Sequence, residues 1–357
     1  MSMNAQHGYS ALEQQALEQL AAMALSPSGD SLLAGRQVYD VVETDGVLRV
    51  FIDTERTSEP EQEMLAEVLA PALKAIQGVQ RVIVKPRPMS VSNGKRISGV
   101  SRVVAVHSGK GGVGKSTLTA ELALLLARQG MRVGVLDADI YGPSAPILFG
   151  THGAIHETAG KMTPLEAHGV KLMSLGFLLP DDQALIWRGS LVDSGLPQFF
   201  SDVAWGELDI LLVDLPPGTS DVHLAALQAC EFDGVITITA PGQVSLDDVR
   251  RGMEMFADLA VPCLGLVENQ SSVLCVHCGT LSPLFGSEGG GLLAEKIGLP
   301  LLARLPFDPA LAEAADEGQL AEVLRDDHPL VTALQPLLER LKGLLQRKAQ
   351  TNAEVLQ

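Results

Sequence analysis

The residues with the clearest chemistry form one glycine-rich stretch, residues 109–117, G-K-G-G-V-G-K-S-T, which satisfies the P-loop pattern G-x-x-x-x-G-K-[ST]. Glycines let successive backbone N–H groups point at phosphate oxygens, and a following helix adds the positive end of its dipole. Lys115 supplies a charge to the β- and γ-phosphates, and the Ser116 hydroxyl suits a magnesium ion. The stretch predicts a site for ATP and Mg²⁺. Its predicted nucleotide-binding residues are Gly109, Lys110, Gly111, Gly112, Val113, Gly114, Lys115, Ser116 and Thr117.

Three aspartates follow apolar runs that read as strands. Asp137 and Asp139 come after the run at residues 133–136, and Asp214 comes after the run at residues 210–213. Carboxylates at the carboxyl edge of a parallel sheet face the ligand crevice. We expect Asp139 to orient the attacking water, Asp137 to hold magnesium through water, and Asp214 to lie near the metal as a Walker B residue. Helix capping or solvation would equally explain Asp137 and Asp139 taken alone.

The second lysine of the loop, Lys110, gives the variant G-K-G-G-x-G-K-[ST]. This variant resembles the deviant Walker A motif of the Min, Par, nitrogenase-iron-protein and arsenite-pump ATPases. The resemblance implies that Lys110 reaches across a dimer to the partner's nucleotide. Phosphoryl transfer gains from a cation supplied in trans, so the catalytic prediction comprises Lys110, Lys115, Asp139 and Asp214.

Two of the four cysteines form a C-x-x-C pair, Cys275 and Cys278. The residue after the pair is glycine rather than histidine, which excludes a c-type haem site. Gly, Ser and Pro around it favour a loop over the helix start of a thioredoxin-like pair. A tetrahedral zinc or iron–sulfur site needs about four ligands, which two chains related by a dimer axis would supply. Idle structural thiols remain the alternative, and Cys230 and Cys263 lie in apolar runs typical of a core.

Taken in order, the motifs match the Mrp family of P-loop ATPases, which carry and transfer iron–sulfur clusters. The resemblance covers about residues 100–345 and implies that Asn269 hydrogen-bonds the adenine and that Cys275 and Cys278 ligate a [4Fe–4S] cluster. After Asn269 this chain has Gln-Ser where the family usually has Met-Ser. The matching segments are residues 109–117, 137–144, 173–177, 186–189, 214–219, 268–269, 275–279 and 285–286.

The element pattern predicts an α/β fold: a P-loop NTPase with a mainly parallel sheet flanked by helices, preceded by a small α+β domain. Strand-like and helix-like segments alternate from residue 103, as crossover connections between parallel strands require. The six predicted strands are residues 103–106, 133–136, 170–174, 210–213, 234–239 and 263–268. The N-terminal part reads as a ββαβ unit, and residues 85–99 read as a linker. We place the domains at residues 1–95 and 96–357. The front domain resembles the small iron–sulfur-assembly domain often fused to this family, but residues 57–60 lack the cysteine often found there.

Composition limits the partners. The 357 residues carry a net charge of −17, which argues against a general nucleic-acid binder. No apolar run reaches the length of a membrane span, and few cysteines fit a reducing cytoplasm. We therefore expect a cytoplasmic homodimer whose partners are cluster donors and apo iron–sulfur client proteins, with no nucleic acid and no integral membrane segment. The alternatives are a Min- or Par-type positioning ATPase, with a leucine-faced tail at residues 329–348, and a zinc-bridged dimeric ATPase switch.

Overall fold

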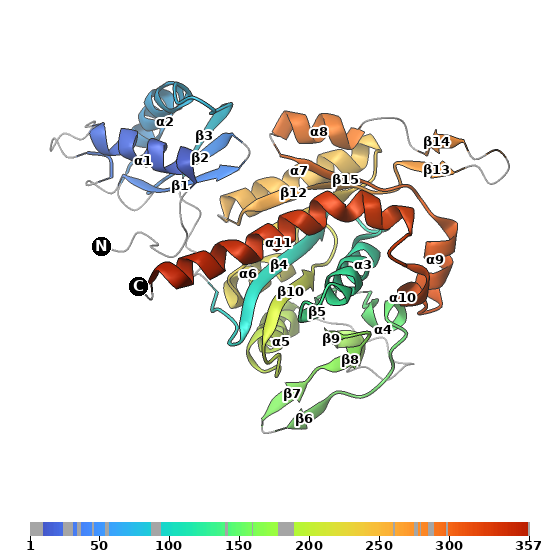
Figure 1. Ribbon diagram of the computed structural model, residues 1–357. Helices are drawn as coiled ribbons and strands as arrows, with labels where there is room; N and C mark the ends of the chain where they lie inside the picture. Colours follow the sequence, from blue (N-terminus) through green and yellow to red (C-terminus); the bar gives the residue numbers. More distant parts are fainter. Residues whose placement is uncertain are drawn as a thin grey trace.

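The computed structural model describes residues 10–23, 31–33, 37–44, 46–53, 57–86, 94–139, 142–158, 160–177, 189–259, 261–274, 278, 280–284, 289–297 and 299–355. These residues build two main β-sheets, each packed against its own hydrophobic core, and two separate two-stranded hairpins (Figure 1). The smaller sheet has three strands and the larger has eight. The predicted fold class of a small α+β unit before a P-loop-type α/β unit describes this arrangement.

The small unit is the expected ββαβ arrangement with one additional helix in front. β1 pairs antiparallel with β2, and β2 pairs parallel with β3. The turn between β1 and β2 contains Gly46 at φ +81°, a left-handed backbone that glycine adopts without a steric penalty. Leucines of α1 and α2 fill the core beneath the sheet, including Leu20, Leu65 and Leu69. The elements are α1 (Ala11–Ala22), β1 (Val38–Thr44), β2 (Val47–Ile52), α2 (Glu59–Lys74) and β3 (Arg81–Pro86).

The large sheet has the strand order β15-β12-β11-β4-β10-β5-β9-β8, and every pair is parallel except β8 with β9. The six strands expected in this unit are all present. The edge strands β8 and β15 were not predicted, because three or four residues show little periodicity. The strands are β4 (Val100–Ser108), β5 (Val133–Asp137), β8 (Leu165–Ala167), β9 (Val170–Ser174), β10 (Leu208–Asp214), β11 (Gly234–Thr239), β12 (Cys263–Glu268) and β15 (Leu301–Arg304).

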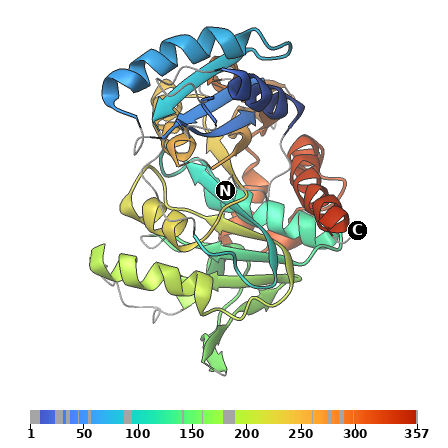
Figure 2. The same ribbon diagram turned by 90° about the vertical axis from the view of Figure 1, so that its left-hand side faces the viewer.

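Helices cover both faces of this sheet (Figure 2). Side chains alternate along β4, so that Val104 packs under α3 and α11 while Val103 and Ala105 pack under α5, α6 and α7. The helices are α3 (Lys115–Arg128), α4 (Ala145–Leu148), α5 (Gly189–Ser201), α6 (Asp221–Ala229), α7 (Gln243–Asp258), α8 (Gly289–Ile297), α9 (Pro309–Asp316), α10 (Leu320–Val323) and α11 (Pro329–Val355). A 3₁₀ turn, η1 (Leu175–Phe177), follows β9. Two hairpins project from the body: β6 (His156–Thr158) with β7 (Lys161–Thr163), and β13 (Ser272–Leu274) with β14 (Leu281–Pro283).

The leucine face of the tail helix α11 is part of the core. Leu334, Leu337, Leu338 and Leu341 are fully buried against the sheet, next to α3. These side chains are therefore not exposed for insertion into a membrane. Among the described residues, no helix is long and apolar enough to cross a bilayer.

The linker is shorter than the sequence suggested, and the expectation for residues 85–99 was wrong at both ends. β3 runs to Pro86, and Lys95 forms a β-bridge with Cys230 in the large unit. Arg96 forms ion pairs with Glu231 at 2.7 Å and Asp233 at 3.5 Å. Only residues 87–93, which lie outside the described residues, remain for the connection. The domain division after residue 95 stays a proposal, with residues from 94 onward packed on the large unit.

Candidate functional site

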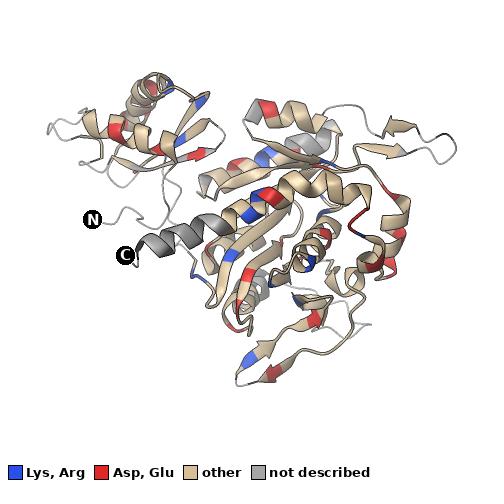
Figure 3. Ribbon diagram, viewed as in Figure 1, with Lys and Arg blue, Asp and Glu red and all other residues tan. Residues whose placement is uncertain are grey.

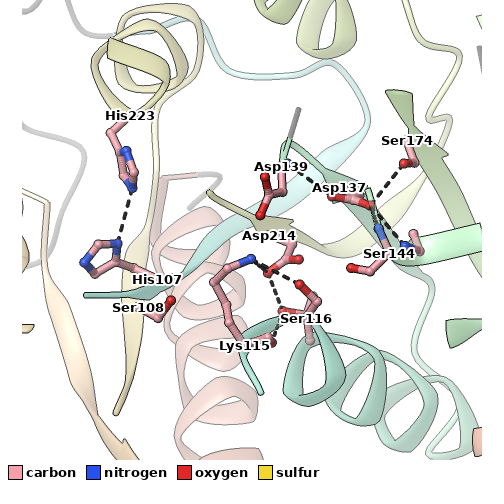
Figure 4. Close-up of polar contacts among 12 residues, drawn as sticks. His107, Ser108, Lys115, Ser116, Asp137, Asp139, Ser144, Ser174, Asp214 and His223 are labelled. Atoms are coloured by element: carbon pink, nitrogen blue, oxygen red, sulfur yellow. Dashed lines mark hydrogen bonds and ion pairs between the residues drawn. The ribbon is translucent and has the colours of Figure 1, made fainter. Parts of the chain in front are cut away.

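The predicted nucleotide-site residues meet at the carboxyl edge of the large sheet. Asp214 at the end of β10 is in register with Val106 of β4 on one side and with Asp137 of β5 on the other. The P-loop leaves β4 at the same edge and enters α3 at Lys115. Figure 4 shows Lys115, Ser116 and Asp214 pointing toward one another, while the Asp137 carboxylate beside them points toward Ser144 and Ser174.

The backbone of the P-loop depends on its glycines. Gly112 and Gly114 have φ of +78° and +85°, and Gly114 precedes α3 without any side-chain cap on the helix. The first N–H groups of α3 are thus left to face the crevice, as an anion site requires. Gly109 is needed for space, since a Cβ there would lie 2.5 Å from Val249 N and 2.6 Å from Asp248 C in α7.

Lys115 and Asp214 form a buried ion pair with 2.6 Å between Nζ and Oδ1. Lys115 Nζ also lies 3.2 Å from Ser116 Oγ, and the Thr119 hydroxyl donates to Asp214 Oδ1 at 3.1 Å. The Ser116 hydroxyl and the Asp214 carboxylate supply the hard oxygen ligands that magnesium prefers. The lysine, the hydroxyl and the carboxylate therefore suit a triphosphate with its metal ion.

Asp137 has a structural task in addition to its predicted one. Its carboxylate accepts hydrogen bonds from the backbone N–H groups of Asp139, Ser144 and Ala145 at 2.9–3.1 Å and from the Ser174 hydroxyl at 3.0 Å. Burial, and then the neighbouring Asp214, raise the pKa of Asp137 to about 6. The four donors use most of the accepting capacity of one carboxylate. Asp137 thus fixes the loop that carries Asp139, and a water-mediated magnesium contact remains a prediction.

Two further residues, Lys110 and Asn269, were also predicted to contact the nucleotide. Lys110 is exposed, and its carbonyl accepts a hydrogen bond from the Ser108 hydroxyl at 3.0 Å. Asn269 donates from Nδ2 to the carbonyl of Val113 at 2.9 Å, so its side chain lies directly against the P-loop. Its predicted contact with adenine remains a prediction.

A buried histidine pair beside the P-loop was not predicted, because His107 and His223 lie 116 residues apart. Ser220 N–H donates to His223 Nδ1 at 3.2 Å, which leaves the His223 proton on Nε2, 3.3 Å from His107 Nδ1. Burial is the main cause that lowers the pKa of both imidazoles, His223 to about 4. His107 Nε2 has no hydrogen-bond partner among the described residues and packs against Gly252 of α7. The pair joins the strand before the P-loop to the helix after Asp214.

Of the C-x-x-C pair, only Cys278 belongs to the described residues, and it lies between β13 and β14. Cys275 is outside the described residues; Cys278 is exposed, and its thiol lies 3.3 Å from the Thr280 hydroxyl. Cys230 and Cys263 are buried, and burial raises the pKa of their thiols to about 12 and about 11. The expectation that these two belong to the core is confirmed. In the described part of the chain, no group of three or more His, Cys, Asp or Glu side chains can hold a metal ion.

Comparison with known proteins agrees with this geometry. Residues 99–342 match the family model described as NUBPL iron-transfer P-loop NTPase. The iron–sulfur cluster carrier protein of Pseudomonas fragi is 43% identical over 245 residues, which are 68% of this chain and 85% of that protein. The protein of the same name from Synechocystis is 36% identical over 324 residues, 88% of this chain and 92% of its own.

Solved structures confirm the predicted fold class. The nucleotide-binding protein of Archaeoglobus fulgidus in complex with ADP has a TM-score of 0.57 and 37% identity, covering 64% of this chain and 90% of that one. MinD of Pyrococcus horikoshii, complexed with Mg-ADP, has a TM-score of 0.52 at 21% identity, covering 69% and 98%, a likeness of fold alone.

Proposed function

Because the chain belongs to the family of NUBPL-type iron-transfer P-loop NTPases, we propose that it is an ATP-hydrolysing carrier that binds a [4Fe–4S] cluster between two protomers and transfers it to apo-proteins. Family membership confirms the predicted resemblance and the predicted enzyme class, a P-loop ATP hydrolase. The cluster, its bridging position and its delivery are the parts that we propose.

The exposed cysteine hairpin is the observation that carries this proposal. Cys278 is exposed on the hairpin β13–β14, whereas Cys230 and Cys263 are buried in the core. Cys275 and Cys278 are therefore the pair that suits a cluster exchanged with other proteins. Two thiolates leave a [4Fe–4S] cluster half-ligated, and a second protomer placed by a twofold axis completes the set of four. The cluster is cargo here, so ligands that solvent and partner can reach suit delivery.

The nucleotide site supplies the other half of the activity. Lys115 and the P-loop N–H groups bind the phosphates, while Ser116 and Asp214 hold the magnesium ion that neutralises the developing charge. Asp139 orients the attacking water, and the exposed Lys110 acts on the partner's nucleotide. We also propose a cytoplasmic location, because an exposed thiol such as that of Cys278 stays reduced in a reducing compartment.

The test is the iron and sulfide content after anaerobic reconstitution, with the dimer fraction followed by size. About four irons per dimer are expected from the four-thiolate geometry. Cys275→Ala and Cys278→Ala should each abolish cluster binding but keep ATP binding, and Cys230→Ala and Cys263→Ala are the matched controls that retain the cluster. Full iron loading of the Cys275→Ala/Cys278→Ala protein would refute the assignment. Zinc without sulfide in the wild type would favour the zinc-bridged switch instead.

A further inference from the structure

Two side-chain amides hold the outer side of the P-loop. Asn269 Nδ2 donates to the Val113 carbonyl at 2.9 Å, and Gln270 Nε2 donates to the Gly112 carbonyl at 3.3 Å. Both residues directly follow β12. Gly114, which has no Cβ, is what allows the Asn269 amide to approach this closely.

The backbone at Gln270 is unusual. Its φ is +54°, in the left-handed region that residues other than glycine seldom adopt. The neighbours on both sides hold it there, since Asn269 N donates to the Thr239 carbonyl at 2.8 Å and Ser271 N donates to the Leu305 carbonyl at 3.0 Å. Such strained residues gather at binding sites and switches. Gln270 also occupies the position at which this chain departs from the family's usual Met-Ser.

Peptide geometry gives these two bonds a consequence for phosphate binding. In a trans peptide unit the C=O and the following N–H point in opposite directions. A donor on the Gly112 carbonyl therefore directs the Val113 N–H to the other side of the loop, where phosphate oxygens bind. In the same way, the Asn269 amide on the Val113 carbonyl orients the Gly114 N–H. Bonding at the carbonyl also polarises the peptide and strengthens its N–H as a donor.

The same segment leads into the cysteine hairpin. Ser271 is followed by β13, and Cys275 comes directly after the last residue of that strand, Leu274. The strand is held in place because Phe307 N donates to the Ser272 carbonyl at 2.7 Å and the Ser271 hydroxyl donates to the Leu305 carbonyl at 3.0 Å. Residues 269–270 therefore form the direct chain connection between the P-loop carbonyls that they contact and the base of the hairpin.

We infer that Gln270, with Asn269, positions the phosphate-binding N–H groups of Val113 and Gly114 and links their occupancy to the cysteine hairpin. The inference rests on the nucleotide site of the proposed function but not on the cluster. Coupling between two sites is reciprocal, so a ligand at either site changes the affinity of the other by the same factor.

The first test measures the affinity of the full-length protein for a non-hydrolysable ATP analogue with Mg²⁺. Gln270→Met keeps the side-chain length but removes the donor, and binding should weaken about 2- to 10-fold, the value of one hydrogen bond. Gln270→Gly removes the donor as well while relieving the backbone strain, so it serves as a second variant that folds. Gln15→Met, on the exposed side of α1, is the matched control and should bind like the wild type. Wild-type affinity in both Gln270 variants would overturn the positioning role.

The second test measures the rate at which iodoacetamide alkylates Cys278 in the cluster-free protein, with and without the analogue. Cys230 and Cys263 are buried and serve as internal references. At saturating analogue we expect the wild-type Cys278 rate to change several-fold and the two Gln270 variants to lose most of that change. An unchanged wild-type rate, or an equal change in the variants, would refute the link. A failure of cluster binding would leave this result untouched, whereas a wild type that cannot bind the analogue would refute the proposed nucleotide site.

Discussion

At the scale of single residues, the nucleotide site is a set of buried charges balanced against one another. Lys115 is the cation paired with Asp214, and Asp137 lies in register beside Asp214. Neighbouring carboxylates in a low-dielectric environment repel each other, which contributes to the raised pKa of Asp137. Lys115, which we propose to bind phosphate, therefore also compensates the buried charge of Asp214 in the folded protein.

Replacing Lys115 by alanine should abolish hydrolysis and also destabilise the nucleotide-free protein, by roughly 3–5 kcal/mol for a buried charge left unpaired. Adding Asp214→Asn to that variant should restore much of the stability, because the unpaired charge is gone, without restoring turnover. Thermal unfolding and magnesium-dependent phosphate release check the two effects. Wild-type hydrolysis by Lys115→Ala would contradict the assignment of the P-loop. A double variant no more stable than the single one would show that the unpaired charge of Asp214 is not what destabilises the protein.

Glu121 of α3 is a buried carboxyl whose pKa is raised to about 8, chiefly by burial and then by Asp308. The folded protein holds this proton more tightly than the unfolded chain, so the free energy of unfolding falls as pH rises from about 4.5 to about 8. Glu121→Gln should therefore melt at a higher temperature than the wild type at pH 8, with the difference shrinking toward pH 5. Melting curves across this range, with the exposed Glu313→Gln as control, test it. A pH-independent difference would show that the carboxyl titrates normally.

At the scale of elements, α7 contacts both the P-loop and the strand before it, β4. It meets Gly109 through the backbone of residues 248–249, and Gly252 of the same helix lies against the His107 imidazole. The pair of imidazoles in turn joins β4 to α6, which follows the loop after Asp214. The position of α7 therefore depends on close contacts with Gly109 in the P-loop and with His107 just before it.

A methyl group at position 252 should not fit against His107. Gly252→Ala is expected to cost about 1–3 kcal/mol through overpacking. His107→Ala removes the imidazole, so the double variant should be less destabilised than the sum of the two single variants. Gly343→Ala in α11, where a Cβ meets nothing within 4 Å, is the matched control and should gain about 0.5–1 kcal/mol. Denaturant unfolding measures all four; strict additivity would contradict the contact.

At the scale of the whole molecule, the acidic charge is distributed over both units rather than gathered on one helix (Figure 3). With a net charge of −17, electrostatics favours partners other than nucleic acid. The proposed assembly is a twofold dimer in which both the cluster and the catalytic lysine are shared. In such a dimer, ATP hydrolysis and cluster binding each need residues from both chains.

Subunit mixing tests the shared lysine. Lys110→Ala should lose hydrolysis more than ATP binding, because a cation supplied in trans stabilises the transition state. Mixing it with Lys115→Ala protein, under conditions that exchange subunits, should restore part of the activity through sites that combine an intact P-loop with the partner's Lys110. Full activity of Lys110→Ala alone would exclude a catalytic role for that residue.

The sequence by itself determined the local features of this protein. The P-loop motif and the six central strands are each contiguous in sequence, so periodicity and spacing were enough to predict them. The Mrp-type resemblance was likewise carried by short segments and was confirmed by the family match. Even the glutamine after Asn269 was visible as a departure from the family, although its contact was not.

Only the tertiary structure decided which distant residues meet. The His107–His223 pair, the Asp137 hydrogen bonds to Ser144 and Ser174, and the Gln270 amide on Gly112 all join segments separated by 7 to 158 residues. The linker was misjudged for the same reason, because Arg96 is fixed by carboxylates more than a hundred residues away. The role of a side chain depends on which distant segment packs against it, and the strand order and the helix packing determine that segment. The spacing of residues along the sequence does not contain this information.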